Sequence, residues 1–223
     1  MPLNRVSPLR LTGRSTSHFT RLVRMLAHEL AVPLELEVVN DLMSLDAATY
    51  GGHPALKLPT LHVGDAALFG TENICRALAG LAGRANDPRV VLPHQVTSTL
   101  VQSAQELAWH AMTVQVQLVI GVRIAKLPAE NIFFTKATAG MNGALAWLDA
   151  RLDPVLAELP SPRDVSVFEL SLFCLIEHIV FRPTVSLESF PRLRGFAEAF
   201  ATRDSAQRTP FQLDPVPTPK EVS

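Results

Sequence analysis

Three small hydroxyl residues, Ser15, Thr16 and Ser17, stand where the first predicted helix begins. The N–H groups of a helix's first turn have no partner within the helix and carry a partial positive charge, so this end favours a bound anion. A hydroxyl group there can also donate a hydrogen bond to such an anion. Ser17 is therefore a candidate for stabilising a bound anion or, in the simpler interpretation, for capping the helix.

The elements that position these hydroxyls follow from the pattern of apolar residues. Alternation at Leu9 and Leu11 predicts a strand, and helical spacing from Phe19 to Leu30 predicts a helix that Pro33 separates from a second strand. We expect the second strand at 34–39, a short irregular helix within 41–52, two strands at 58–63 and 66–69, and a helix at 71–82, giving the order β-α-β-α-β-β-α.

Only helical patterns follow Asn86. The stretch 83–93 is a predicted linker, so we expect one domain at 1–82 and a second, all-helical domain at 94–223. Predicted helices cover about 94–124 and 130–159, a nearly all-apolar and hence buried helix covers 166–181, and a last one runs from Leu193 to Phe200. The tail from Leu213 has no pattern and is predicted to be irregular.

Composition argues against several classes of partner. Lys and Arg number 20 against 21 Asp and Glu, so there is no basic footprint for nucleic acid or an anionic membrane. The two cysteines offer neither a disulfide framework nor a zinc spacing, and the histidines form no metal motif. We expect a cytoplasmic protein without a metal, a nucleic-acid partner or a membrane segment.

Two motifs of the first domain resemble those of bacterial glutathione transferases. Residues 13–24 are similar to the family's first strand, turn and helix, with Ser17 at its small hydroxyl residue. Residues 53–61, His-Pro-Ala-Leu-Lys-Leu-Pro-Thr-Leu, resemble Asn-Pro-x-Gly-Lys-Val-Pro-x-Leu, with Pro59 at the proline that is cis in the family.

Three further segments extend the resemblance. Residues 68–74 resemble Leu-x-Glu-Ser-x-Ala-Ile, with Thr71 at the serine. Ser166 to Glu169 resembles the capping box before the family's buried helix, and residues 190–193 with 203–209 resemble its closing helix and tail. The order and spacing of the five segments are more specific than any one of them.

The resemblance implies a thioredoxin-like N-terminal domain that binds glutathione, followed by an all-helical glutathione transferase domain. It implies a homodimer that activates the glutathione thiol, as co-substrate, for attack on an electrophilic, partly apolar small molecule. The implied binding residues are Ser17 for the sulfur, Leu58 beside Pro59 for the cysteinyl main chain, Lys57 for the glycyl carboxylate and Thr71 for the γ-glutamyl carboxylate.

Two departures keep an alternative open. Gly70 replaces the family's Glu or Gln, for which Glu72 is a weak substitute, and Leu56 replaces a glycine. The alternative is a non-catalytic ligand-binding or interaction module with this fold, and a third option is a glutathione-dependent isomerase or dehalogenase. Candidates for the second-substrate pocket, or simply for the core, are Trp109, His110, Met112 and Phe168.

Overall fold

The N-terminal half of the chain is built on a mixed four-stranded sheet with the order β2-β1-β3-β4. The computed structural model describes residues 9–215. Strand β1 (Leu9–Gly13) runs parallel to β2 (Leu34–Val38) and antiparallel to β3 (Thr60–Val63), which forms a hairpin with β4 (Ala66–Phe69). This arrangement, with helices α1 (His18–Glu29) and α2 (Thr71–Leu81), confirms the predicted thioredoxin-like domain.

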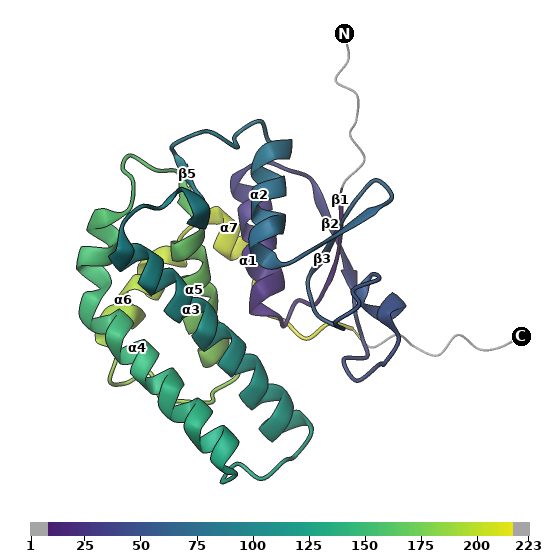
Figure 1. Cartoon of the computed structure of the whole chain (residues 1–223), viewed down its shortest axis with the longest axis vertical. Coiled ribbons are helices and arrows are strands. Elements are labelled where there is room, and N and C mark those ends of the chain that lie inside the picture. The colour runs from purple at the N-terminus through teal and green to yellow at the C-terminus, as the bar shows by residue number, and fades with distance from the viewer. Residues whose placement is uncertain (1–8, 216–223) are drawn as a thin grey trace, which may run out of the picture.

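A close approach between β1 and α1 fixes where the first helix starts. A Cβ atom on Gly13 would lie 2.6 Å from the methyl group of Thr20, so only glycine fits at the end of β1. Helix α1 then buries Leu22, Val23 and Leu26 between the sheet and the helical half. Figure 1 shows α1 and α2 in this position, beside the sheet.

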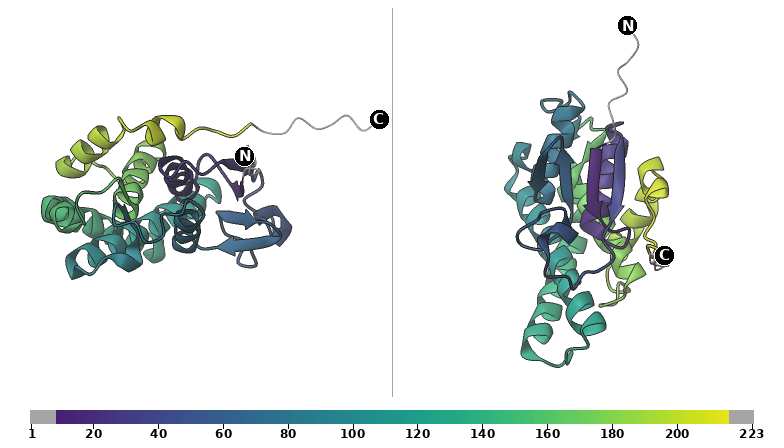
Figure 2. Two further views of the ribbon diagram at one scale, coloured as in Figure 1. Left: turned by 90° about the horizontal axis from the view of Figure 1, so that it is seen from above. Right: turned by 90° about the vertical axis from the view of Figure 1, so that its right-hand side faces the viewer.

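The helical half surrounds α5 (Val167–Phe181), which packs against α1, α3 and α6 and confirms the predicted buried helix. Helix α3 (Thr99–Gln117) continues as a π-helix, Leu118–Ile124, and packs antiparallel to α4 (Ile132–Glu158) in the long hairpin of Figure 1. Helices α6 (Pro191–Phe200) and α7 (Asp204–Arg208) close the chain, and α7 packs on α1 (Figure 2).

One helix of the described chain, Thr99–Ile124, is long and apolar enough to cross a membrane by length and composition alone. In the fold its inner face packs against α4 and α5. Its apolar character is therefore explained by the packing of the helical half.

The predicted linker at 83–93 contains structure that its composition did not indicate. Strand β5 (Val90–Val91) pairs in parallel with β6 (Val165–Ser166), and both β5 valines are buried. The pair Val90–Val91 thus joins the core instead of crossing solvent. The domain limits at 82 and 94 stay a prediction.

Two other expectations need correction. The strand expected from residue 58 begins at Thr60, whereas the short irregular helix expected within 41–52 is present as the 3-10 helix Ala47–Tyr50. The capping box at α5 is half formed: Ser166 Oγ accepts the Glu169 N–H at 3.5 Å, but the Glu169 carboxylate binds the Arg163 guanidinium at 2.8 and 3.0 Å. An arginine within reach competes successfully for that carboxylate.

Candidate functional site

A cleft of about 440 Å³ lies between the two halves of the molecule. On one side it is lined by the start of α1, by residues 56–58 and by Thr71 at the start of α2, which we call the sheet side. On the other it is lined by α3, by the π-helix after it and by the end of α5, which we call the helix side.

Ser17 occupies the N-cap position of α1 and lines the cleft. Its Oγ accepts the main-chain N–H of Thr20 at 3.2 Å, so the capping role is present. A hydroxyl that accepts one hydrogen bond still has its own hydrogen to donate. Capping the helix and donating to a ligand in the cleft are therefore compatible roles for Ser17.

The two competing hydroxyl residues are fixed by other contacts. The Ser15 N–H donates to the Asp214 carboxylate at 3.0 Å, and Ser15 is buried and does not line the cleft. Thr16 lines the cleft, and its carbonyl accepts a hydrogen bond from His178 Nε2 at 3.0 Å. The choice left open by the sequence thus narrows to Thr16 and Ser17.

His178 connects the start of α1 to the helical half. Gln115 Nε2 lies 3.1 Å from His178 Nδ1 and donates to the Arg182 carbonyl at 2.9 Å, while the Gln115 side-chain oxygen accepts from Thr184. Because the amide group donates to Nδ1, the proton of the neutral ring lies on Nε2 and points to Thr16. Burial, the largest cause, lowers the pKa of His178 to about 4, and the charges of Arg182 and Arg21 act in the same direction.

His18 is the second buried histidine at this site. Its ring centroid lies 4.4 Å from that of His178, and within the described chain neither nitrogen makes a hydrogen bond of regular geometry. Burial, and then the charge of His178, lower its pKa well below the usual value, although the Met112 main chain opposes this. His18 thus lines the cleft with both ring nitrogens shielded from solvent.

The Leu58–Pro59 peptide is cis, as the resemblance implied, and Leu58 lines the cleft. Among the described residues the Leu58 main-chain N–H and carbonyl have no hydrogen-bond partner, so both are available to an extended ligand. Lys57 is exposed at the rim of the cleft, and Pro59 is buried and holds the turn into β3.

Thr71 lines the cleft at the first position of α2, and Gly70 is the N-cap residue before it. Gly70 has φ = +87°, a backbone conformation that residues with a side chain rarely adopt. The Glu72 carboxylate pairs with Arg76 one turn along the helix at 2.6 Å and does not line the cleft. Gly70 contributes no side chain here, and Glu72 does not replace the missing one.

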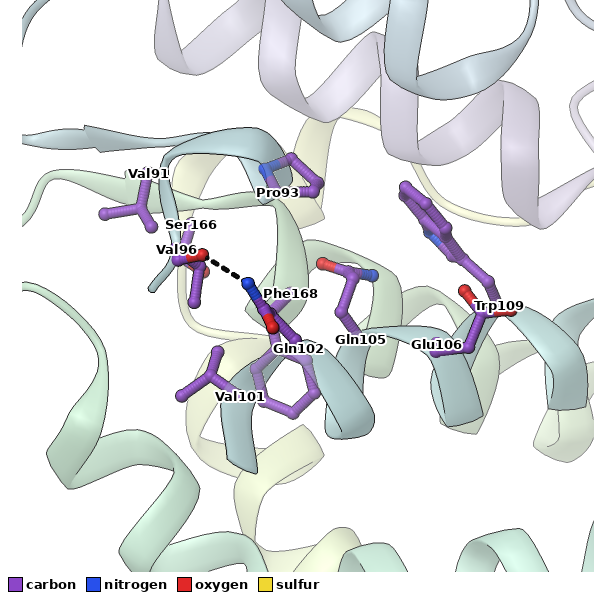
Figure 3. Close-up of a pocket in the computed structure, with 10 residues that line it drawn as sticks. All are labelled: Val91, Pro93, Val96, Val101, Gln102, Gln105, Glu106, Trp109, Ser166 and Phe168. Carbon is purple, nitrogen blue, oxygen red and sulfur yellow. Dashed lines mark hydrogen bonds between the residues drawn. The ribbon is translucent and has the colours of Figure 1, made fainter. Parts of the chain in front are cut away.

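The four residues predicted for the second-substrate pocket do not line this cleft. Met112 and Phe168 are core residues, and His110 is exposed beside Glu106 at 3.2 Å. Trp109 donates to Ser171 Oγ at 3.1 Å and, with Phe168, lines a separate cavity of about 140 Å³ near the start of α3 (Figure 3). Helical spacing alone does not indicate which face of α3 meets which cavity.

The helix side is lined instead by residues that the sequence did not single out. They come from the next turns of α3, the π-helix and the end of α5: Thr113, Val116, Gln117, Val119, Ile120, Ile124 and Arg182. Most are apolar, so this side suits an apolar molecule. A signal was present in the sequence, because Val116 to Ile124 prolongs the apolar pattern beyond Met112.

Tyr50, the only tyrosine of the chain, is another lining residue that the sequence did not predict. Its hydroxyl donates toward the carbonyls of Leu42 at 2.8 Å and Ser44 at 3.1 Å. Burial, and then the charge of Asp41, raise its pKa. Tyr50 therefore holds the 42–44 loop and has no hydrogen to donate to a ligand's sulfur.

Comparisons with known proteins agree with this geometry. The family model for the glutathione S-transferase N-terminal domain matches residues 16–81, while no curated protein matches the chain in sequence. A glutathione transferase family member from Pseudomonas fluorescens, solved with bound glutathione, is 20% identical with a TM-score of 0.76 and covers 92% of this chain and 100% of its own.

Two other solved structures give similar results. A glutathione S-transferase from Methylobacterium radiotolerans, in complex with glutathione sulfonate, is 16% identical with a TM-score of 0.73, over 97% of this chain and 100% of that one. Glutathione transferase F7 from Populus trichocarpa is 18% identical with a TM-score of 0.69, over 90% and 97%. Residues 16–81 thus match the glutathione S-transferase N-terminal domain, and the chain as a whole has the fold of glutathione transferases.

Proposed function

We propose that the protein is a glutathione transferase in which Ser17 favours the thiolate of bound glutathione for attack on an electrophilic, partly apolar molecule. The observation that carries the proposal is the position of Ser17, at the N-terminus of α1 and facing a cleft whose opposite side is apolar. A nucleophile activated on the sheet side then meets an apolar electrophile on the helix side.

The chemistry needs only modest stabilisation of the sulfur anion. Lowering a thiol pKa by about two units corresponds to about 2.7 kcal/mol, which one hydroxyl donor and a helix N-terminus can supply together. The thiolate attacks the electrophilic carbon, a C–S bond forms, and the leaving group departs with its electron pair. The thiol proton goes to solvent.

Glutathione fits the sheet side through main-chain groups above all. The unpaired Leu58 N–H and carbonyl suit its cysteinyl peptide, and Thr71 with the α2 N-terminus suits its γ-glutamyl carboxylate. Lys57 at the rim suits the glycyl carboxylate. Neighbours of the same fold were solved with glutathione or its sulfonate, which supports the same ligand here.

The second candidate is a non-catalytic ligand-binding or interaction module with the same fold. Gly70 favours it, because this residue offers no side chain to the γ-glutamyl group, which is left to Thr71 and the α2 N-terminus, and affinity for glutathione is then expected to be modest. In either case we propose a cytoplasmic homodimer with domains at 1–82 and 94–223, since a site close to a two-fold interface is typical of this family. Light scattering that gives only a monomer at micromolar concentration contradicts the dimer.

Two measurements on the full chain test the function. Calorimetric titration with glutathione is expected to show saturable binding, and chlorodinitrobenzene is expected to be conjugated faster with the protein than without it. Binding without conjugation of this or any other aromatic halide favours the non-catalytic module. Absence of glutathione binding refutes the transferase and leaves the ligand-binding or interaction module.

A further inference from the structure

The charges around the cleft are unequal. Among the described residues that line it are three cations, Arg14, Lys57 and Arg182, but neither an aspartate nor a glutamate. Such a cleft attracts anions, and glutathione itself carries two carboxylates. The three cations are not equivalent, however, because they occupy different sides and have different partners.

Two of the cations belong to the sheet side. Arg14 lies 3.7 Å from the Asp214 carboxylate and donates to the Asn40 carbonyl at 3.1 Å, so its charge is partly neutralised. Lys57 precedes Leu58 at the rim, where the proposed glutathione site ends. Neither is positioned to neutralise an anion held among the apolar residues of α3.

Arg182 is the cation of the helix side. It ends α5, and its main chain is held by the Arg182 N–H to His178 carbonyl bond at 2.8 Å and by Gln115 at its own carbonyl. Its guanidinium lies 5.2 Å from the centre of the Phe181 ring and makes no ion pair within the described chain. A half-buried arginine whose main chain is fixed and whose guanidinium group makes no ion pair is suited to bind a carboxylate.

From this juxtaposition we infer that the second substrate is an amphipathic anion: an apolar electrophile that packs on Val116 and Ile120 and places a carboxylate on Arg182. The inference rests on the proposed function and names the substrate class of the same site. Arg182 is then a specificity-determining residue for the electrophile. Its simpler role, a positive charge at the C-terminus of α5, affects stability without affecting the choice of ligand.

A binding experiment tests the inference independently of catalysis. The probes are dinitrobenzoate and its neutral amide, which have nearly the same shape and no leaving group. Calorimetry on the wild-type chain is expected to give tighter binding of the benzoate by about tenfold, the usual value of a charge-assisted contact. Arg182→Met is expected to abolish that preference, Arg182→Lys to keep part of it, and Arg194→Met, which removes an exposed arginine from α6, to keep all of it.

The kinetic arm uses chlorodinitrobenzoate and chlorodinitrobenzamide with glutathione. The glutathione sulfur forms a bond to the ring carbon, and chloride leaves with the electron pair of the C–Cl bond. The ratio of kcat/KM for benzoate over amide is expected to fall about tenfold in Arg182→Met, a transition-state effect of one charge-assisted contact.

The outcomes separate the inference from the proposed function. If the wild type prefers the benzoate in binding and Arg182→Met does not, while neither chloro compound is conjugated, the anionic ligand class is supported and the transferase is refuted. Conjugation of both compounds with equal binding in wild-type and Arg182→Met overturns the inference and leaves the transferase standing. A rise in the KM for glutathione alone also overturns the inference, because Arg182 then serves the glutathione half.

Discussion

The two sides of the cleft are built on different principles. On the sheet side the groups proposed to hold glutathione are mainly main-chain atoms and short hydroxyls, placed by the N-termini of α1 and α2 and by the turn before β3. On the helix side the groups facing the cleft are long side chains on α3 and α5. Main-chain geometry depends on a few turn residues, whereas a helix face can be repacked by substituting any residue on it.

This difference has a chemical consequence. The sheet side can keep one ligand while its side chains vary, because N–H and carbonyl groups remain when a side chain changes. Under the proposed function the helix side determines which electrophile fits, because Val116, Ile120 and Arg182 contribute to its shape and charge. The cleft would then combine a site for a fixed co-substrate with one whose selectivity can change.

The largest effect is expected on the pH dependence of stability, and it comes from His178, which joins the two sides of the cleft. Its pKa is about 4 in the fold, below the usual 6.5, so between these values the unfolded chain binds a proton that the folded chain does not. Stability contributed by the neutral ring is therefore complete above about pH 6.5 and is lost as the pH falls toward 4. The loss is up to about 3 kcal/mol, and His18 acts in the same direction.

Urea unfolding of the wild type and of His178→Gln at several pH values between 7.5 and 5 measures this effect. The variant is expected to be less stable at neutral pH, because its link to Thr16 is altered, but to lose less stability per pH unit. The difference between the two proteins removes the contribution of the carboxylates. If the unfolding free energies of the two proteins fall in parallel with decreasing pH, the effect does not come from His178.

The sheet side was largely predictable from the sequence, because its elements are marked by residues with local meaning. Ser17 before an apolar helical run, Pro59 before a strand, and Gly70 before Thr71 each indicate a turn or helix end. Ser17, Leu58 and Thr71 do meet at one cleft. Their roles toward a ligand stay a prediction.

The helix side was not predictable in the same way. Trp109 and Val116 lie two turns apart on nearly the same face of one helix, yet Trp109 lines the smaller cavity (Figure 3) and Val116 lines the cleft. Tertiary packing decides which turn of α3 meets which of the two. The partners Asp214 and His178 are distant in the sequence from the residues they hold, Ser15 and Thr16. Periodicity carries no information on such long-range contacts.

Ser17→Ala tests the sheet side directly. Loss of one hydrogen bond to sulfur, worth about 1–2 kcal/mol, is expected to lower the conjugation rate about tenfold or more and to raise the thiol pKa. The matched control is Ser98→Ala, since Ser98 caps α3 by accepting the Val101 N–H at 3.2 Å and does not line the cleft. Both variants lose a cap, worth about 1 kcal/mol, but only Ser17→Ala is expected to lose activity. Equal conjugation rates in the two variants would mean that Ser17 only caps the helix.

Gly70→Ala tests whether the backbone conformation next to the proposed γ-glutamyl site requires glycine. Because Gly70 has φ = +87° and a new Cβ would lie 3.3 Å from Asn73 Nδ2, the substitution is expected to destabilise the fold by about 1 kcal/mol or more. Gly80→Ala in the same helix meets no atom within 4 Å and is expected to stabilise it by about 0.5–1 kcal/mol. Thermal melting compares the two, and a gain in stability for both contradicts the strained conformation at Gly70.

The smallest effect is expected at Leu56, which lines the cleft with φ = +54° where the family motif has a glycine. A left-handed conformation costs a residue with a side chain about 1–2 kcal/mol, and glycine avoids this cost but loses more entropy on folding. Leu56→Gly is therefore expected to raise stability by only about 0.5 kcal/mol, visible as a small rise in the melting temperature.

Binding shows which side of the cleft Leu56 serves. If Leu56 only shapes the turn before Leu58, Leu56→Gly is expected to leave the calorimetric affinity for glutathione within about twofold, because the main-chain groups remain. If its side chain also covers the electrophile, affinity for dinitrobenzoate falls while that for glutathione holds. A large loss of glutathione affinity would instead mean that a side chain holds this ligand on the sheet side, and the division between main-chain and side-chain recognition would then fail at the turn where the family motif is most altered.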